Sequence, residues 1–121
     1  MFHPQGPSFQ ELAAQALSST ERGYDLLAPK FDYTPFRTPQ SLLDAVAIQL
    51  RTMGPFSSGL DLCCGTGAGI MVLQSLCRDQ TVGVDFSRGM LQVCKQQCAA
   101  LQGAIRTQLV RADVLALPFT D

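Results

Sequence analysis

The sequence lacks an excess of charge of either sign and lacks a long apolar run. Nine Lys and Arg residues stand against ten Asp and Glu residues, which leaves a formal net charge of −1. That balance provides no basic surface for nucleic acid or for an anionic membrane. No apolar run approaches the roughly 20 residues of a membrane span, and the N-terminus MFHPQGPSFQEL has no basic start followed by an apolar core. We therefore expect no nucleic-acid partner, no membrane span and a cytoplasmic location.

Histidine and paired cysteines are also scarce. The chain has one histidine, His3, and its five cysteines include no CxxC pair. This scarcity argues against a structural zinc site, and we predict no metal site. In a reducing compartment, free cysteines serve as small apolar side chains. Cys94 and Cys98, which stand four residues apart on a predicted helix, are then expected to be neighbours in the core.

The N-terminal part of the chain is predicted to be helical. With 121 residues, 46% of them hydrophobic, the chain is long enough for one domain with a core. Ser8 and Glu11 form a capping box, and a second short helix is expected over Thr20–Leu27. Thr38, as N-cap, starts the best-marked helix, which Gly54 ends. One face of this last helix is apolar and is expected to pack in the core. Its residues are Leu42, Leu43, Val46, Ala47, Leu50 and Met53.

The second half of the chain alternates between strands and helices. Short apolar runs predict strands at Leu60–Cys63, Thr81–Phe86 and Thr107–Ala112. Ser87 is expected to cap the helix that follows the second strand and runs to Gly103. Strands and helices that alternate with tight connections predict right-handed crossovers and a parallel sheet. The predicted fold class is therefore α/β, a Rossmann-like three-layer sandwich with parallel strands in the order 3-2-1.

A glycine-rich turn in GLDLCCGTGAGI, residues 59–70, follows the first strand, where open α/β sheets bind their ligands. A phosphate-binding loop needs lysine and then serine or threonine after its glycines, but Ile70 and Met71 stand there. A dinucleotide fingerprint that starts from Gly65 and Gly67 needs a third glycine at position 70. The turn therefore matches neither motif.

The stretch LDLCCGTGAG resembles the first motif of class I S-adenosylmethionine (SAM)-dependent methyltransferases, an acid-x-Gly-x-Gly-x-Gly turn. Asp61, Gly65 and Gly67 match this motif, whereas Cys63 stands where the first glycine is common. SAM carries no phosphate, so no lysine is needed, and glycines let the backbone lie against its methionine and ribose. The resemblance implies a cofactor site that includes Cys63, Gly65, Thr66 and Gly67, with Asp61 at the methionine ammonium.

Two later stretches resemble further signatures of this family. In VGVDFSRGML, the resemblance implies that Asp85 binds two ribose hydroxyls, Phe86 lies against the adenine and Met90 lines the same wall. In RADVLALPF, it implies that Asp113 accepts a hydrogen bond from the adenine amino group and that the backbone near Val114 faces the ring. The three stretches occur in order at strand ends, which favours SAM over NAD. Other interpretations stay open, because an acid after a strand can cap the next helix and both Phe86 and Met90 can be core residues.

The segment GYDLLAPKFDYTPFRTP is similar to the N-terminal part of small-molecule methyltransferases of ubiquinone and menaquinone biosynthesis. In these enzymes a tyrosine-bearing helix and loop cover the cofactor, which makes Tyr24 and Tyr33 candidates for a lid. Anchoring of the helix to the sheet edge fits both tyrosines equally well. The implied organisation is an N-terminal helical lid region, residues 1–58, followed by the SAM-binding βαβαβ half of one methyltransferase domain, residues 59–121.

The resemblance implies in-line transfer of the sulfonium methyl group to a small-molecule acceptor, chiefly through alignment of the two reactants. No base stands out, so no catalytic residue is predicted. In the family, the LPF segment leads into a fourth strand beside the first, so the resemblance covers about half of the family fold and leaves the first strand as an open edge. Two hypotheses follow: the chain is the cofactor-binding half of a methyltransferase, or it is an inactive module that associates through this edge.

Overall fold

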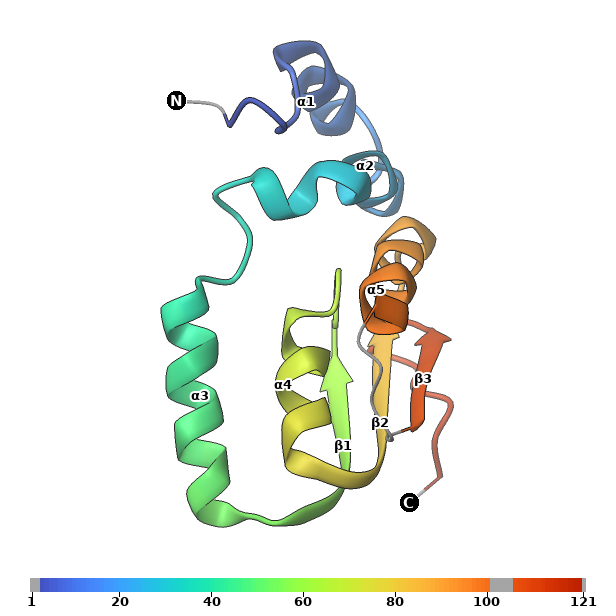
Figure 1. The fold of residues 1–121 in the computed structure, drawn as a ribbon. Coiled ribbons are helices and arrows are strands. Elements are labelled where there is room, and N and C mark those ends of the chain that lie inside the picture. Colours follow the sequence, from blue (N-terminus) through green and yellow to red (C-terminus); the bar gives the residue numbers. More distant parts are fainter. Residues whose placement is uncertain (1–2, 101–105, 121) are drawn as a thin grey trace.

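The computed structural model describes residues 3–100 and 106–120 as a three-stranded parallel sheet preceded by helices (Figure 1). The strand order is β1-β2-β3, which confirms the predicted parallel α/β arrangement. None of the described helices has the length and apolar character needed to cross a membrane. The elements are α1 (Phe9–Ala16), α2 (Thr20–Leu27), the 3-10 helix η1 (Ala28–Tyr33), α3 (Gln40–Met53), β1 (Phe56–Leu62), α4 (Ala68–Leu76), β2 (Cys77–Asp85), α5 (Arg88–Ala100) and β3 (Arg106–Arg111).

The first two strands begin earlier than their apolar runs predict. β1 starts at Phe56, and β2 starts at Cys77, directly after the last residue of α4. In the parallel register, Leu60 lies opposite Val82 and Gly83 lies opposite Leu109. After Phe56 and Cys77 at their first positions, the early residues of both strands are polar or small, so an apolar pattern does not reveal them. Backbone pairing between neighbouring strands extends the sheet there.

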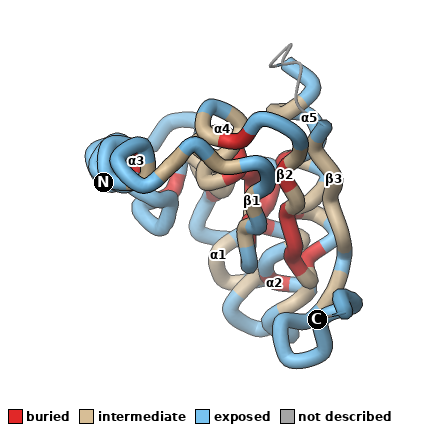
Figure 2. Tube along the Cα trace, turned by 90° about the horizontal axis from the view of Figure 1, so that it is seen from below, coloured by how far each residue is buried: buried red, intermediate tan, exposed pale blue. Residues whose placement is uncertain are grey.

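Helices α4 and α5 pack on the same face of the sheet and share one core. Cys64, Ile70 and Cys94 are buried at its centre, and Leu91, Cys98 and Leu109 pack around them. Figure 2 shows buried residues along β2, beneath these helices. Leu60 and Leu62 point to the opposite face and remain 48% and 45% exposed. The described residues thus form a helix layer and a sheet layer of the predicted sandwich.

Most predicted helix starts are confirmed. Both hydrogen bonds of the capping box between Ser8 and Glu11 are present, and Ser87 Oγ accepts a hydrogen bond from Met90 N at 3.1 Å at the start of α5. The predicted cap of α3 is wrong, because Pro39 rather than Thr38 is the N-cap and no side chain caps this helix. The predicted end of the last helix at Gly103 lies outside the described residues.

The predicted core face of α3 is largely exposed. Leu42, Val46 and Met53 are 54%, 42% and 64% exposed, and Ala47 is buried. Figure 1 shows α3 standing beside α4, away from the strands. A helix with one packing neighbour buries only a narrow stripe of side chains, so the apolar face of α3 extends beyond its contact with α4.

An aspartate on α2 attaches the N-terminal helices to α5. Asp25 Oδ1 accepts hydrogen bonds from Ser87 Oγ at 2.6 Å and from Gly89 N at 2.8 Å. The two helices approach closely, because a Cβ atom at position 89 would lie 2.8 Å from Asp25 Cα. The hydrogen bond from Ser87 is the main cause of a pKa of Asp25 below its ordinary value. The ionised carboxylate therefore favours the docked arrangement.

The turn between β1 and α4 has left-handed backbone at three positions. Cys63, Gly65 and Gly67 have φ angles of 60°, 53° and 101°. Only glycine adopts this conformation without a steric cost. Cys63, at the place where the resembled motif has its first glycine, therefore carries local strain. The sequence motif alone suggests that a glycine is common at this position because it lets a ligand approach the backbone closely. The structure shows a second, conformational reason, which is the positive φ angle.

We expect Asp25→Ala to lower the free energy of unfolding by about 1–2 kcal/mol at pH 7, because hydrogen bonds to a charged group are worth about 1.5–3 kcal/mol and Asp25 is only partly buried. Since the folded-state pKa of Asp25 is lowered, its contribution is present above the ordinary aspartate pKa and disappears as pH falls through the lowered value. Urea unfolding at neutral and acidic pH measures both effects. Equal stability of the two proteins at pH 7 would contradict this role of Asp25.

We expect Cys63→Gly to raise the free energy of unfolding by about 0.5–1 kcal/mol, because relief of left-handed strain exceeds the entropy cost of a more flexible unfolded chain. Cys63→Ala is the matched control, because alanine removes the thiol but keeps the Cβ atom that causes the strain. Chemical denaturation of the three proteins is the measurement. A gain of the same size in the alanine variant would rule out backbone strain as the cause.

Candidate functional site

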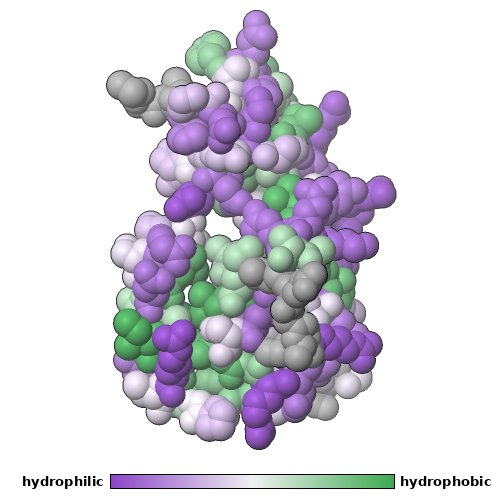
Figure 3. All heavy atoms as spheres, in the orientation of Figure 1, coloured by the Kyte–Doolittle hydropathy of each residue, from purple (hydrophilic) through white to green (hydrophobic). Residues whose placement is uncertain are grey.

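A cavity of about 620 Å³ lies between α3 and the glycine turn that leads into α4. Four residues of the predicted cofactor site line it: Asp61, Cys63, Gly65 and Thr66. Figure 3 shows hydrophobic residues gathered around the sheet and α4, whereas the N-terminal helices above them are mainly hydrophilic. Ligand pockets have volumes of about 300–1,000 Å³, so the turn faces a space of ligand size.

Asp61 places a half-buried carboxylate at this cavity. Burial raises the pKa of Asp61 above its ordinary value, and the negative charge of Asp85 adds to the rise. The carboxylate lies against the backbone of α4, because a Cβ atom at position 69 would be 2.4 Å from Asp61 Oδ2. Gly69, which the sequence motif alone did not explain, thus makes room for Asp61. A carboxylate in this electrostatic setting favours a cationic ligand group.

Asp85 lies at the end of β2, beneath the glycine turn. Its Oδ2 atom accepts a hydrogen bond from Gly65 N at 2.9 Å, and its Oδ1 atom accepts one from Ser87 N at 2.9 Å. The residue is 7% exposed. Each carboxylate oxygen has a further lone pair, so both can accept another hydrogen bond. In the structure, Asp85 therefore holds the glycine turn in place through its hydrogen bond with Gly65. The contact of Asp85 with ribose stays a prediction.

The predicted aromatic residues lie in different surroundings. Tyr24 contacts Phe86 edge-to-face, with ring centroids 6.0 Å apart and an interplanar angle of 80°. Tyr33 stacks on His3, with ring centroids 5.0 Å apart. Met90 is 2% exposed and presents almost no surface to a ligand. Tyr24, one of the two candidate lid tyrosines, thus contacts the predicted site residue Phe86.

The residues after β3 form a turn next to the end of β2. Ala112 N donates a hydrogen bond to the backbone oxygen of Asp85 at 3.2 Å, which ties the two strand ends together. Asp113 Oδ1 accepts a hydrogen bond from Leu115 N at 2.9 Å, and Val114 is 41% exposed. The predicted adenine-binding residues therefore lie at the same edge of the sheet as Asp85, and their contacts with adenine stay predictions.

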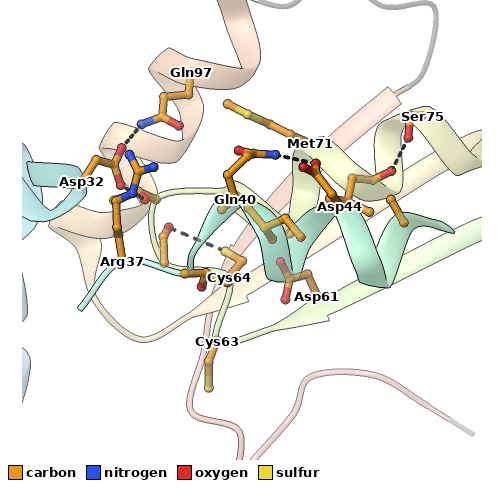
Figure 4. Close-up of a pocket in the computed structure, with 18 of the residues that line it drawn as sticks. Asp32, Arg37, Gln40, Asp44, Asp61, Cys63, Cys64, Met71, Ser75 and Gln97 are labelled. Carbon is orange, nitrogen blue, oxygen red and sulfur yellow. Dashed lines mark hydrogen bonds between the residues drawn. The ribbon is translucent and has the colours of Figure 1, made fainter. Parts of the chain in front are cut away.

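Asp32 is a site residue that the sequence did not reveal. Its Oδ1 atom accepts a hydrogen bond from Thr66 Oγ1 at 2.7 Å, and its Oδ2 atom accepts one from Gln97 Nε2 at 2.6 Å. Figure 4 shows Asp32 and Gln97 at one end of the cavity. Asp32 thus joins η1, the glycine turn and α5. An aspartate between aromatic residues of the connecting segment carried no sequence signal for this role.

Four of the five cysteines are buried or partly buried as small apolar side chains, whereas Cys63 is exposed. The Sγ atoms of Cys94 and Cys98 are 3.9 Å apart, which confirms the predicted core neighbours. Burial raises the pKa of Cys98 to about 11, so this thiol stays protonated at neutral pH. Cys64 is buried under the turn and Cys63 is exposed. In the described part of the chain, no cluster of His, Cys, Asp and Glu could hold a metal ion.

Comparison with known proteins places these features in a family. Residues 60–121, just over half of the chain, match the family model described as "Methyltransferase domain". Demethylmenaquinone methyltransferase of Staphylococcus epidermidis is 42% identical over 67 residues, which cover 54% of this chain and 27% of that enzyme. The same enzyme of Bacillus cereus is 37% identical over 76 residues, or 61% of this chain and 32% of that enzyme. The chain therefore spans only a minor part of the curated relatives that it matches.

Solved structures of other proteins share the fold of this chain. A proposed S-adenosyl-L-methionine-dependent methyltransferase of Methanococcus maripaludis is 25% identical, with a TM-score of 0.56 over 65% of this chain and 36% of that chain. The DhpI-SAM-HEP complex is 20% identical, with a TM-score of 0.62 over 88% of this chain and 45% of that chain, a likeness that shows the fold alone. Because the family model matches more than half of the chain, the chain belongs to the methyltransferase domain family.

Proposed function

We propose that this chain binds SAM at the glycine turn, and that the whole protein transfers the methyl group of SAM to a small-molecule acceptor. The observation that carries the proposal is the half-buried carboxylate of Asp61 at the 620 Å³ cavity. A methionine ammonium would offset the cost of ionising Asp61 there. The room that Gly69 leaves for this carboxylate supports the same assignment.

Other residues of the predicted site are expected to contact the remaining parts of SAM. Gly65 leaves room for close approach, because no atom lies within 4 Å of the place that a Cβ atom would take, and the second lone pairs of Asp85 suit the ribose hydroxyls. Phe86 and the turn around Asp113 would flank the adenine. SAM supplies an electrophilic methyl group on its sulfonium. The protein contributes alignment of this group with the acceptor, and such alignment can lower a barrier by about 7–11 kcal/mol.

The acceptor class follows from the relatives and stays a proposal. The matching enzymes of S. epidermidis and B. cereus are named for demethylmenaquinone, but this chain covers 27% and 32% of them. We propose a small-molecule acceptor and a cytoplasmic setting. Turnover of the whole protein with quinone precursors, phenols and amines would identify the acceptor, and activity restricted to a macromolecule would contradict the proposal.

The direct test is a calorimetric titration of the chain with SAM and with its demethylated product. We expect saturable binding of both ligands at one site, because the predicted contacts involve the shared adenosine and amino-acid parts. The alternative function, an interaction module that associates through the edge of β1, draws on the exposure of Leu60 and Leu62. Absence of binding, together with self-association that increases with concentration in sedimentation experiments, would favour that alternative.

We expect Asp61→Asn to weaken SAM binding by roughly 10- to 100-fold, because a charge-assisted hydrogen bond is worth about 1.5–3 kcal/mol. Asp44→Asn is the matched control: Asp44 also lines the cavity, but its carboxylate accepts a hydrogen bond from Gln40. The control should bind SAM within about twofold of the unchanged chain. Equal losses in the two variants would remove Asp61 from the ammonium site.

The same variant should become more stable while it loses affinity. Because the folded-state pKa of Asp61 is raised, its contribution to stability is full below the ordinary aspartate pKa and is lost as pH rises through the raised value. A neutral amide at this position would carry no such loss, so urea unfolding at pH 7 should show a higher free energy of unfolding for Asp61→Asn. A variant that is less stable than the unchanged chain at pH 7 would contradict this electrostatic account.

A further inference from the structure

We propose that Asp32 is a positioning residue, which anchors Thr66 of the glycine turn and thereby couples SAM binding at the turn to docking of the N-terminal helices. The inference rests on the proposed function. Asp32 belongs to η1 and lines the 620 Å³ cavity together with Thr66 and Gln97. Both oxygens of its carboxylate accept hydrogen bonds from the protein. We therefore assign Asp32 an effect on SAM that passes through Thr66, rather than a contact with SAM.

The two hydrogen bonds of Asp32 join three parts of the chain. Thr66 Oγ1, in the turn, donates to Asp32 Oδ1 at 2.7 Å, and Gln97 Nε2, on α5, donates to Asp32 Oδ2 at 2.6 Å. Figure 4 shows the second of these bonds at one end of the cavity. Thr66 is 4% exposed, so its hydroxyl has little access to water if η1 moves away. Because hydrogen bonds to a carboxylate are stronger than bonds between neutral groups, this contact ties the turn to η1.

The turn needs an anchor at this position because of its backbone. Thr66 stands between Gly65 and Gly67, whose φ angles are 53° and 101°. Glycine loses more conformational freedom than any other residue when its backbone becomes fixed. Asp85 holds the backbone N–H of Gly65, and Asp32 holds the side chain of the residue that follows. A turn that is fixed before the ligand arrives loses less conformational entropy on binding.

Docking of the N-terminal segment and fixing of the turn therefore belong to one equilibrium. Helix η1 packs against α2 and α5, and α2 also packs against α5. Figure 1 shows these N-terminal elements at the end of the sheet to which the strand arrows point. When the segment is docked, Asp32 holds Thr66, and when it moves away the hydroxyl loses this partner. A ligand that prefers the fixed turn must shift the segment toward the docked state, and docking must raise the affinity for that ligand by the same factor.

The first test measures SAM affinity by calorimetry in the unchanged chain, in Asp32→Ala, in Thr66→Val and in the double variant. We expect each single variant to bind SAM roughly 5- to 20-fold more weakly, within the usual range of coupling between sites. The double variant should bind no more weakly than either, because both changes remove the same hydrogen bond. Asp32→Asn keeps an acceptor for the Thr66 hydroxyl and should bind SAM within about threefold of the unchanged chain.

Glu11→Ala is the matched control for these variants. Glu11 is also an acid that binds η1, through its ion pair with Lys30, but neither of these two residues lines the cavity. The control should bind SAM within about twofold of the unchanged chain. Circular dichroism checks that each variant is folded.

Hydrogen exchange gives a second readout, which a merely structural role of Asp32 would not change. In the unchanged chain, we expect SAM to slow amide exchange in α2 and η1 as well as in the turn and α4. In Asp32→Ala, saturating SAM should still slow exchange in the turn and α4, but no longer in α2 and η1. If Asp32 only stabilised η1, exchange there would be faster in the variant, and SAM would slow it by the same factor as before.

Several results would overturn the inference. Additive losses in the double variant would show that Asp32 and Thr66 act separately, as they would if Asp32 contacted the ligand itself. Unchanged SAM binding by folded Asp32→Ala, or an Asp32→Asn variant as weak as Asp32→Ala, would exclude the anchoring role. So would exchange in α2 and η1 that SAM still slows in Asp32→Ala.

Two further results keep the inference separate from the proposed function. Failure of the unchanged chain to bind SAM would overturn the proposed function, and the inference with it. Should Asp32→Ala fail to fold, Thr66→Val decides the question, because it removes the same hydrogen bond from the side of the turn. Unchanged SAM binding by Thr66→Val would then overturn the inference while the proposed function stands.

Discussion

The arrangement of this molecule depends on the carboxylate of Asp85 at the end of the central strand. One of its oxygens holds Gly65 in the glycine turn, and the other holds Ser87 at the start of α5. A buried carboxylate is costly unless hydrogen bonds compensate it, so these two N–H groups must remain in place. The turn after β1 and the start of α5 are thereby fixed relative to each other, and the strand ends between them form one surface.

Two further aspartates connect the N-terminal helices to this surface. Asp25 accepts hydrogen bonds from Ser87 and Gly89, and Asp32 accepts one from Thr66 in the turn. The N-terminal segment is therefore attached at Thr66 of the predicted cofactor site and at the start of α5, next to Asp85. A ligand that changes the turn would change the docking of α2 and η1 as well, which gives a physical basis for the proposed lid region.

Two energetically unfavourable features lie close together, one at the end of β1 and one in the glycine turn that follows it. Cys63 adopts left-handed backbone, and Asp61 is a half-buried carboxylate with a raised pKa. Neither the left-handed backbone of Cys63 nor the ionised form of Asp61 favours folding. Costs of this kind concentrate at functional sites, where the geometry of the site outweighs local stability. The family match and the cavity agree with this interpretation.

The sequence by itself determined the parallel strand order, the capping of helices by Ser8 and Ser87, and the glycine turn with its acids at strand ends. These features arise from patterns among residues close together in the chain, which propensity and spacing encode directly. Only the tertiary structure decided the partners of Asp25 and Asp32, the space that Gly69 leaves for Asp61 and the exposure of the apolar face of α3. Those outcomes depend on which distant segments pack against one another, and no local pattern specifies such contacts.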